Sequence, residues 1–237
     1  MQAMILAAGY GKRLRPLTDT LPKPLVEMGG RPLLDHTLTR LAGLGIRRVV
    51  INVHHLADQI IAHVGDGAGF GLEVVWSRES VLLETGGGVR LALTHLGAEP
   101  FLAVNGDVAW DLALAPLIRG FDAARMDGLL GLVPTPDGGR GDFIVDPVSG
   151  GLRRSVAGEA GWIYSGLQMA RPGALEGYPI EPFSLNRFYD DAIQAGRLFG
   201  VVLEGFWADI GTPERLERTR AAWKKRFAIG PGLAYKG

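Results

Sequence analysis

Residues 4–25, MILAAGYGKRLRPLTDTLPKPL, join a short apolar run to a loop that is rich in glycine and cations. The apolar run predicts a buried strand over residues 3–8. Gly9 and Gly11 allow the backbone to approach a ligand closely, so that main-chain N–H groups can point at phosphate oxygens. The stretch therefore predicts a phosphate site directly after the first strand.

Two common phosphate-binding loops fit this stretch poorly. A dinucleotide fingerprint needs a third glycine where Leu14 stands, and Pro16 disfavours a long helix there. An NTPase P-loop needs Ser or Thr after its lysine, whereas Lys12 is followed by Arg13. We expect a different triphosphate loop, in which Arg13 offers a bidentate fork and flanking prolines aim Lys23. A solvated basic surface loop is the alternative.

Composition excludes several classes of protein. The 237 residues carry 25 Lys and Arg against 25 Asp and Glu, so no basic excess points to nucleic acid. The absence of cysteine excludes disulfides, thiol catalysis and cysteine-ligated zinc. No run of about 18 apolar residues and no secretory signal is present, which predicts a cytoplasmic protein without a membrane partner.

Strand and helix patterns alternate along the first half of the chain. Apolar and β-branched runs predict strands over residues 3–8, 48–53, 72–76 and 101–104. Helical spacing predicts helices over 31–44, 56–64 and 89–96. This order predicts an α/β fold with a Rossmann-like, mostly parallel mixed sheet flanked by helices. Further on, the patterns predict strands over 129–133, 143–146 and 162–169, a loop over 134–139, and a last helix that Thr212 and Pro213 begin.

The motifs together resemble a known family. The stretch at 6–25 resembles the signature of the sugar-1-phosphate nucleotidyltransferases, L-A-A-G-x-G-x-R-L-x-P-L-T followed by P-K-P. The resemblance continues through NVHHL at 52–56, ETGGG at 84–88, NGD at 105–107 and WADIGTP at 207–213, so it covers nearly the whole chain. Within the family, ETGGG, NGDVAWD and GRGDF are most similar to the short uridylyltransferases that act on N-acetylmuramic acid 1-phosphate.

The resemblance implies a reaction and a division of the chain. UTP would react with N-acetylmuramic acid 1-phosphate in the presence of Mg²⁺, releasing pyrophosphate, in the recycling of cell-wall sugars. One nucleotidyltransferase domain would span residues 1–237, with a nucleotide-binding half at about 1–110 and a sugar-binding half at about 111–237. No appended acyltransferase repeat domain is expected. The oligomeric state is left open.

The resemblance also implies a nucleotide site. Arg13 and Lys23 would be the catalytic cations, since they can neutralise the charge on the phosphates. The three glycines of ETGGG would let the base or ribose rest against the backbone, although a flexible hinge is the alternative. The residues implied to bind nucleotide are Leu6, Ala7, Ala8, Gly9, Gly11, Gly86, Gly87 and Gly88.

Two aspartates follow apolar strands, where ligands bind in open α/β sheets. Asp107 follows the strand predicted over 101–104, and Asp209 follows a second apolar run. Magnesium takes oxygen ligands, and the resemblance implies that both aspartates bind it. From the residues alone, each could equally be a turn former. Asp111 is expected to cap the helix that follows it.

The implied sugar-phosphate site comprises Asn105, Arg140, Gly141, Glu159 and Gly166. Arg140 could pair with the lactyl carboxylate of muramic acid, a group that hexose phosphates lack, or lie in a surface turn. Gly166 falls within a predicted strand, which indicates a close backbone approach. Relatives have Glu-Lys-Pro where this chain has Glu159-Ala160-Gly161, so the lysine contact is missing. His54 and His55 are expected to cap or pack.

Three alternatives remain open. The acceptor could be a hexose 1-phosphate, as in the mannose-1-phosphate guanylyltransferases or the glucose-1-phosphate uridylyl- and thymidylyltransferases. The chain could instead be a non-catalytic nucleotide-sugar sensor, but a sensor would be expected to lose Arg13, Lys23 or one of the aspartates. A Rossmann dehydrogenase is disfavoured by Arg13 and Leu14.

Overall fold

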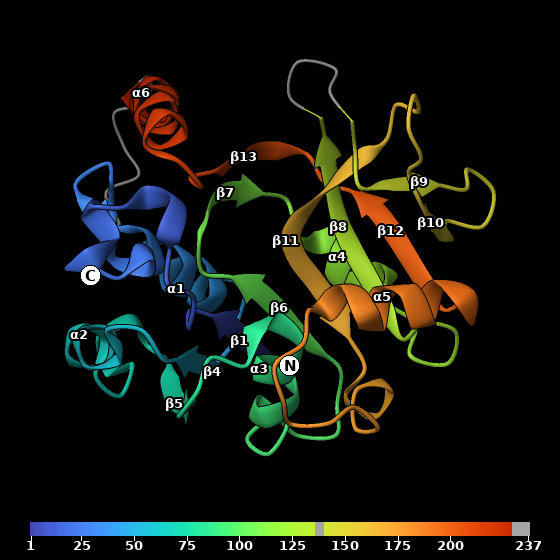
Figure 1. Cartoon of the computed structure of the whole chain (residues 1–237), viewed down its shortest axis with the longest axis horizontal. Helices are drawn as coiled ribbons and strands as arrows, with labels where there is room; N and C mark the ends of the chain where they lie inside the picture. The colour runs from blue at the N-terminus through green and yellow to red at the C-terminus, as the bar shows by residue number, and fades with distance from the viewer. Residues whose placement is uncertain (136–139, 229–237) are drawn as a thin grey trace.

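A computed structural model describes residues 1–135 and 140–228 (Figure 1). Its centre is a nine-stranded mixed sheet in which seven strands follow the order β10-β9-β11-β6-β1-β4-β5. The strands from the first half are parallel to one another, as predicted. These are β1 (Gln2–Leu6), β4 (Arg48–Val53), β5 (Glu73–Arg78) and β6 (Phe101–Asn105). The centres of these strands are apolar because helices cover the sheet, including α1 (Leu33–Gly43), α2 (Ala57–Val64) and α3 (Glu84–Ala92).

The second half extends the same sheet with antiparallel strands. The long strand β11 (Trp162–Ala170) pairs antiparallel with β6 and with β8 (Gly128–Pro134). β12 (Leu198–Val202) runs parallel to β8. The mixed, mostly parallel sheet is therefore confirmed. The remaining elements of this half are β9 (Phe143–Val145), β10 (Leu152–Arg154), α4 (Ala115–Gly120) and α5 (Leu185–Gln194).

Two small ladders lie outside the central sheet. β7 (Val108–Leu112) pairs antiparallel with β13 (Gly205–Asp209), and β2 (Glu27–Met28) pairs with β3 (Arg31–Pro32). Figure 1 shows β13 crossing the molecule to reach the C-terminal helix α6 (Pro213–Ala228). Short 3-10 helices complete the described chain: η1 (Lys12–Leu14), η2 (Leu17–Asp19), η3 (Lys23–Leu25), η4 (Ala68–Phe70) and η6 (Pro172–Ala174).

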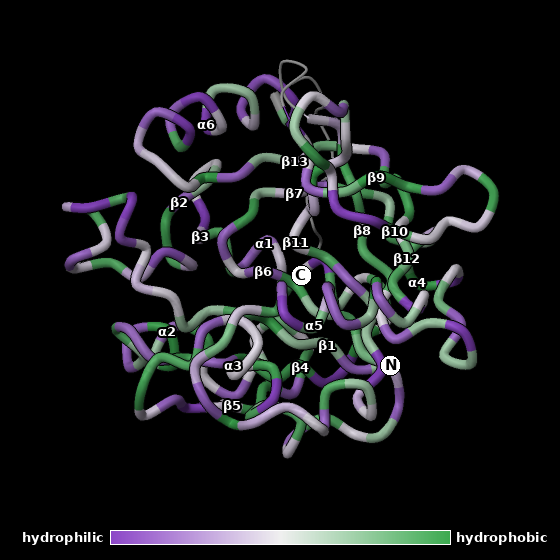
Figure 2. The backbone as a smooth tube through the Cα atoms, turned by 45° about the vertical axis from the view of Figure 1, so that its right-hand side comes forward, coloured by the Kyte–Doolittle hydropathy of each residue, from purple (hydrophilic) through white to green (hydrophobic). Residues whose placement is uncertain are grey.

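Helix α6 packs against the glycine-rich loop. Thr212 Oγ1 accepts a hydrogen bond from the Arg215 amide at 3.3 Å, which confirms the predicted start of this helix. In Figure 2 much of α6 is hydrophilic, whereas β8 carries long hydrophobic stretches. The apolar side chains of α6, Leu216 and Trp223, share a buried cluster with Leu14 of the loop. None of the helices within 1–135 and 140–228 is long and apolar enough to cross a membrane.

The structure corrects several predicted elements. The helix predicted over 89–96 is α3 and begins at Glu84, so the glycine triplet lies inside the helix and not before it. Asp111 does not cap a helix: it lies in β7, where Arg226 contacts it at 2.9 Å, and α4 begins only at Ala115. The residues 136–139 of the predicted loop lie outside the described chain.

Candidate active site

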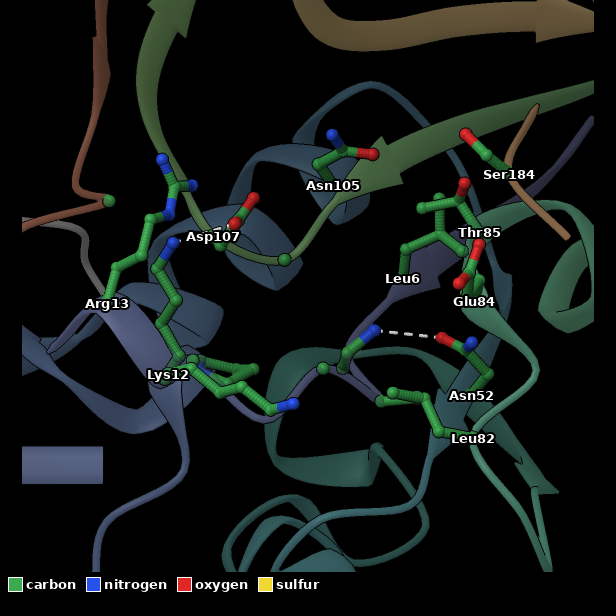
Figure 3. Close-up of a pocket in the computed structure, with 18 residues that line it drawn as sticks. Leu6, Lys12, Arg13, Asn52, Leu82, Glu84, Thr85, Asn105, Asp107 and Ser184 are labelled. Atoms are coloured by element: carbon green, nitrogen blue, oxygen red, sulfur yellow. Dashed lines mark hydrogen bonds and ion pairs between the residues drawn. The ribbon is translucent and has the colours of Figure 1, made fainter. Parts of the chain in front are cut away.

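A cavity of about 440 Å³ lies at the carboxyl ends of β1 and β6 (Figure 3). The structure brings nine of the predicted residues to its lining: Leu6, Ala7, Ala8, Gly9, Gly11, Arg13, Lys23, Asn105 and Asp107. Nine other residues also line it and were not predicted as site residues: Lys12, Pro24, Asn52, Leu82, Glu84, Thr85, Gly106, Ser184 and Gly211. Figure 3 shows Arg13 and Asp107 on one side of the cavity, with Glu84, Thr85 and Ser184 on the opposite side.

The glycine-rich loop is held in place by Thr18. Gly11 has φ +63°, and a Cβ on it would lie 2.9 Å from Cγ2 of Thr18. The Thr18 hydroxyl donates a hydrogen bond to the Gly11 carbonyl at 2.9 Å. A side chain at position 11 would therefore be strained by its backbone conformation and would collide with Thr18.

Two cations of the loop line the cavity, one buried and one exposed. Lys23 is only 7% exposed between two buried prolines, and its Nζ lies 2.7 Å from Oδ2 of Asp107. Arg13 is exposed, and its guanidinium lies over Gly211, where an added Cβ would be 3.0 Å from Cζ. Both cations therefore converge on the region around Asp107, as Figure 3 shows for Arg13.

A buried polar network supports the floor of the cavity. Asn52 accepts a hydrogen bond from the Ala7 amide at 2.8 Å and donates one to Glu79 at 2.6 Å. The other Glu79 oxygen accepts the Leu83 amide at 2.8 Å. Burial raises the pKa of Glu79, against the opposing effect of these hydrogen bonds. The network links the end of β1 to the segment that precedes α3. In the sequence, only the NVHHL motif, which begins at Asn52, pointed to this network.

The glycine triplet lies outside the lining of this cavity. The amides of Gly86 and Gly87 donate to the Phe183 carbonyl at 2.8 and 3.3 Å, so they are already used. A Cβ on Gly86 would lie 2.2 Å from the Phe183 ring, and one on Gly87 would lie 2.1 Å from the Glu181 carbonyl oxygen. Close packing explains these glycines. The nucleotide contact predicted for Gly86, Gly87 and Gly88 stays a prediction. Of the ETGGG motif, Glu84 and Thr85 line the cavity.

A second cavity of about 550 Å³ is lined in part by residues 206–209 of β13. Asp209 lines it and pairs with Val108 in the β7–β13 ladder, which places Asp209 beside the backbone of Asp107. Oδ1 of Asp209 would lie 3.0 Å from a Cβ on Gly211, the residue that also supports Arg13. The pairing of β7 with β13 thus brings Asp107, which lines the first cavity, close in the fold to Asp209, which lines the second.

The two aspartates suit a magnesium ion. Each is partly exposed and is contacted by one cation, Asp107 by Lys23 at 2.7 Å and Asp209 by Arg215 at 2.5 Å. Within the described residues no group of three or more His, Cys, Asp or Glu side chains could hold a metal. Magnesium at phosphate-transfer sites is bound by one or two carboxylates together with substrate phosphates, so this sparse donor set fits.

The predicted sugar-side residues divide into two groups. Gly166 has φ +83° and approaches Asn105, whose Cβ would be 3.0 Å from a Cβ at position 166, so the predicted close approach is found. Arg140 lines the second cavity, and a Cβ on Gly141 would collide with the Gly161 backbone. Glu159 lies outside both cavities.

Glu159 and the two histidines have structural partners. Hydrogen bonds from Arg153, both at 2.7 Å, lower the pKa of Glu159 to about 2 and hold its carboxylate away from the cavities. His54 bonds to the Glu79 carbonyl at 2.9 Å, and His55 to the Thr18 carbonyl at 2.9 Å. These contacts agree with the packing role expected for the histidines.

Several known proteins are similar to this chain in sequence. Residues 2–143 match the family described as "Nucleotidyl transferase". The chain is 39% identical over 234 residues to N-acetylmuramate alpha-1-phosphate uridylyltransferase of Neisseria meningitidis, covering 94% of this chain and 100% of the relative. A relative of the same name from Caulobacter vibrioides is 38% identical, over 90% of this chain and 92% of its own. Mannose-1-phosphate guanyltransferase beta-B of Xenopus laevis is 30% identical, over 98% and 69%.

Solved structures share the fold. HddC from Yersinia pseudotuberculosis superposes with a TM-score of 0.79 at 25% identity, covering 94% of this chain and 99% of that chain. A putative glucose-1-phosphate thymidylyltransferase from Bacillus anthracis gives a TM-score of 0.81, with full coverage of both chains. At 19% identity, the second likeness supports the fold alone.

Proposed function

The chain belongs to the nucleotidyl transferase family and is a sugar-1-phosphate nucleotidyltransferase, and from this we propose that UTP and N-acetylmuramic acid 1-phosphate are its substrates. The products are UDP-N-acetylmuramic acid and pyrophosphate. We place the reaction in the cytoplasm and in the recycling of cell-wall sugars. Two relatives named for this acceptor, at 39% and 38% identity over most of the chain, support the assignment.

The proposal is supported by the strand pairing that links Asp107 of the first cavity to Asp209 of the second. Lys23 and Arg13 line the first cavity, and Arg140 and Arg215 line the second. Asp209 of the second cavity pairs with Val108, the neighbour of Asp107. A triphosphate in the first cavity and a sugar phosphate in the second would meet at these two aspartates. That arrangement suits the transfer of a nucleotidyl group between two phosphates.

The proposed reaction is an in-line displacement. An oxygen of the sugar 1-phosphate attacks the α-phosphorus of UTP, and the bond from this phosphorus to the bridging oxygen of the β-phosphate breaks. The attacking phosphate is already anionic, so no side chain has to remove a proton. Arg13 and Lys23 hold and neutralise the phosphate oxygens, and the glycine-rich loop offers main-chain N–H groups to the same chain of phosphates.

Magnesium would be held by Asp107 and Asp209 and would supply charge neutralisation at the reacting phosphates. Lys23 contacts Asp107 and Arg215 contacts Asp209, so each carboxylate has a cationic partner of its own. All four groups expected of a working enzyme are present, and this argues against a non-catalytic sensor.

A substrate panel tests the proposal. Pyrophosphate release is measured with UTP, GTP, dTTP and ATP against the 1-phosphates of N-acetylmuramic acid, N-acetylglucosamine, glucose and mannose. The expected result is highest kcat/KM for UTP with N-acetylmuramic acid 1-phosphate. GTP is the informative competitor, because mannose-1-phosphate guanyltransferases are among the relatives. A preference for GTP with a neutral hexose would overturn the proposal.

A further inference from the structure

One face of α6 lines the second cavity. Arg215, Arg218, Thr219 and Ala222 all belong to the lining, and their spacing of three, four and seven residues places them along one side of the helix. Leu216 and Trp223 occupy the buried cluster instead. The helix is therefore anchored by its apolar face and presents two arginines to the cavity, one turn apart.

Two opposite charge effects act at these neighbouring arginines, because Glu214, four residues before Arg218, favours the helix whereas the two like charges oppose it. Like charges one turn apart on a helix destabilise it by a few tenths of a kcal/mol. Arg215 is compensated by Asp209, at 2.5 Å. Arg218 is exposed, and among residues 1–135 and 140–228 no carboxylate lies within 4.0 Å of it. Its guanidinium is therefore available to an anionic ligand in the second cavity.

Arg140 lines the same cavity but precedes β9, far from α6 in the sequence. One of its Nη atoms donates to the Ser155 carbonyl at 3.1 Å, which fixes the side chain and leaves other donors of the guanidinium unused by described residues. The aspartate nearest to it in sequence, Asp142, accepts the Tyr164 amide at 3.0 Å. The lining thus offers two arginines, Arg140 and Arg218, that have no carboxylate partner in the described chain.

We propose that Arg218, together with Arg140, binds the carboxylate of the acceptor sugar and so selects an acidic sugar 1-phosphate over a neutral one. This inference rests on the proposed function and assigns its acceptor specificity to a residue of the C-terminal helix. A guanidinium forms bidentate, charge-assisted hydrogen bonds with a carboxylate.

The acceptor phosphate is assigned to the other end of the cavity. It must reach the α-phosphorus beside Asp107 and Asp209. Arg218 lies three residues beyond Arg215, which is about 4.5 Å further along the helix axis from the contact with Asp209. In N-acetylmuramic acid 1-phosphate the lactyl group is attached to a different ring carbon from the phosphate, so its carboxylate can extend to a separate part of the cavity.

The test compares two acceptors that differ only in the lactyl group. We measure kcat/KM with UTP for N-acetylmuramic acid 1-phosphate and N-acetylglucosamine 1-phosphate, in wild-type protein, Arg218→Ala and Arg218→Lys. Losing an interaction with a charged group should lower kcat/KM for the acid by about 10- to 100-fold in Arg218→Ala. The value for N-acetylglucosamine 1-phosphate should stay within about twofold. Arg218→Lys should recover only part of the loss, because the bidentate geometry is missing.

A substrate change separates carboxylate binding from a structural effect. Replacing the lactyl carboxylate by its carboxamide should lower kcat/KM more in the wild-type protein than in Arg218→Ala, where only the contact with Arg140 is left to lose. The matched control is Lys225→Ala, which removes another exposed cation of α6 outside both cavities and should leave the acceptor preference intact. Thermal unfolding of each variant checks that α6 stays docked.

The outcomes distinguish the two proposals. A wild-type enzyme that does not prefer the acid overturns the proposed function and this assignment with it. A wild-type preference that survives in Arg218→Ala overturns the assignment alone. Equal losses for both acceptors also overturn it, because they would mean that Arg218 holds the phosphate shared by both sugars.

Discussion

The ammonium group of Lys23 lies 2.7 Å from a carboxylate oxygen of Asp107, and the lysine is 7% exposed. A buried ammonium needs a partner, since an unpaired charge in this position would be costly. Asp107 therefore has two roles in our proposal: it neutralises Lys23 in the free protein and binds magnesium when nucleotide is present. The lysine and the metal would share one carboxylate.

Replacing Lys23 tests this sharing. Lys23→Met keeps much of the buried stem but removes the charge, and we expect turnover to fall about a hundred- to a thousandfold. Binding of Mn²⁺ without nucleotide, followed by electron paramagnetic resonance, should become tighter because Asp107 loses its competing cation. Normal turnover in this variant, or weaker Mn²⁺ binding, would contradict the shared carboxylate.

Two aspartates close in sequence should differ sharply in importance. Asp107→Asn should abolish metal-dependent pyrophosphate release, at a cost of at least roughly a thousandfold. Asp111→Asn is the matched control, since Asp111 contacts Arg226 at 2.9 Å and Arg40 at 3.4 Å and lies outside both cavities. It should lose less than about 1 kcal/mol of unfolding free energy and keep its turnover. Comparable activity losses in the two variants would refute the metal assignment.

The stability of the protein should depend on Asp127 in acid. Its carboxylate accepts hydrogen bonds from Arg171 and Arg197, and although burial acts in the opposite direction, these bonds lower its pKa. A folded-state pKa below the unfolded value means that the unfolded chain binds more protons, so the stabilisation is lost as the pH falls below about 4. Urea unfolding of Asp127→Asn should show a shallower decrease in stability over this range. An unchanged pH slope would contradict this origin.

Local sequence is enough to predict the glycine-rich loop and the first strands. The cations and glycines of 4–25 lie within one continuous stretch, and the alternation of strand and helix follows from short-range periodicity. Residues 48–53 form β4 with the predicted bounds. The nine predicted residues that reach the first cavity mostly follow β1 or β6, since the carboxyl ends of parallel strands meet at one edge.

The sequence does not reveal that Asp107 and Asp209 lie near each other. Asp107 and Asp209 are about a hundred residues apart, and only the pairing of β7 with β13 makes them neighbours. The helix predicted over 89–96 excludes the glycine triplet because glycine weakens helices by about 1 kcal/mol relative to alanine. Glycine is needed in the triplet because Glu181 and Phe183 approach it closely, and no local sequence pattern reveals this contact.

The packing account of the triplet predicts opposite effects at two helical glycines. In Gly87→Ala the new Cβ would lie 2.1 Å from the Glu181 carbonyl oxygen, so backbone must move and stability should fall by about 1–3 kcal/mol. Gly43, at the end of α1, has no atom within 4 Å of an added Cβ, so Gly43→Ala should gain about 0.4–1 kcal/mol. Urea unfolding measures both. The KM for UTP should rise only in Gly87→Ala, because Glu84 and Thr85 at the start of α3 line the nucleotide cavity. A stable Gly87→Ala variant with a raised KM would instead support direct nucleotide contact by the triplet.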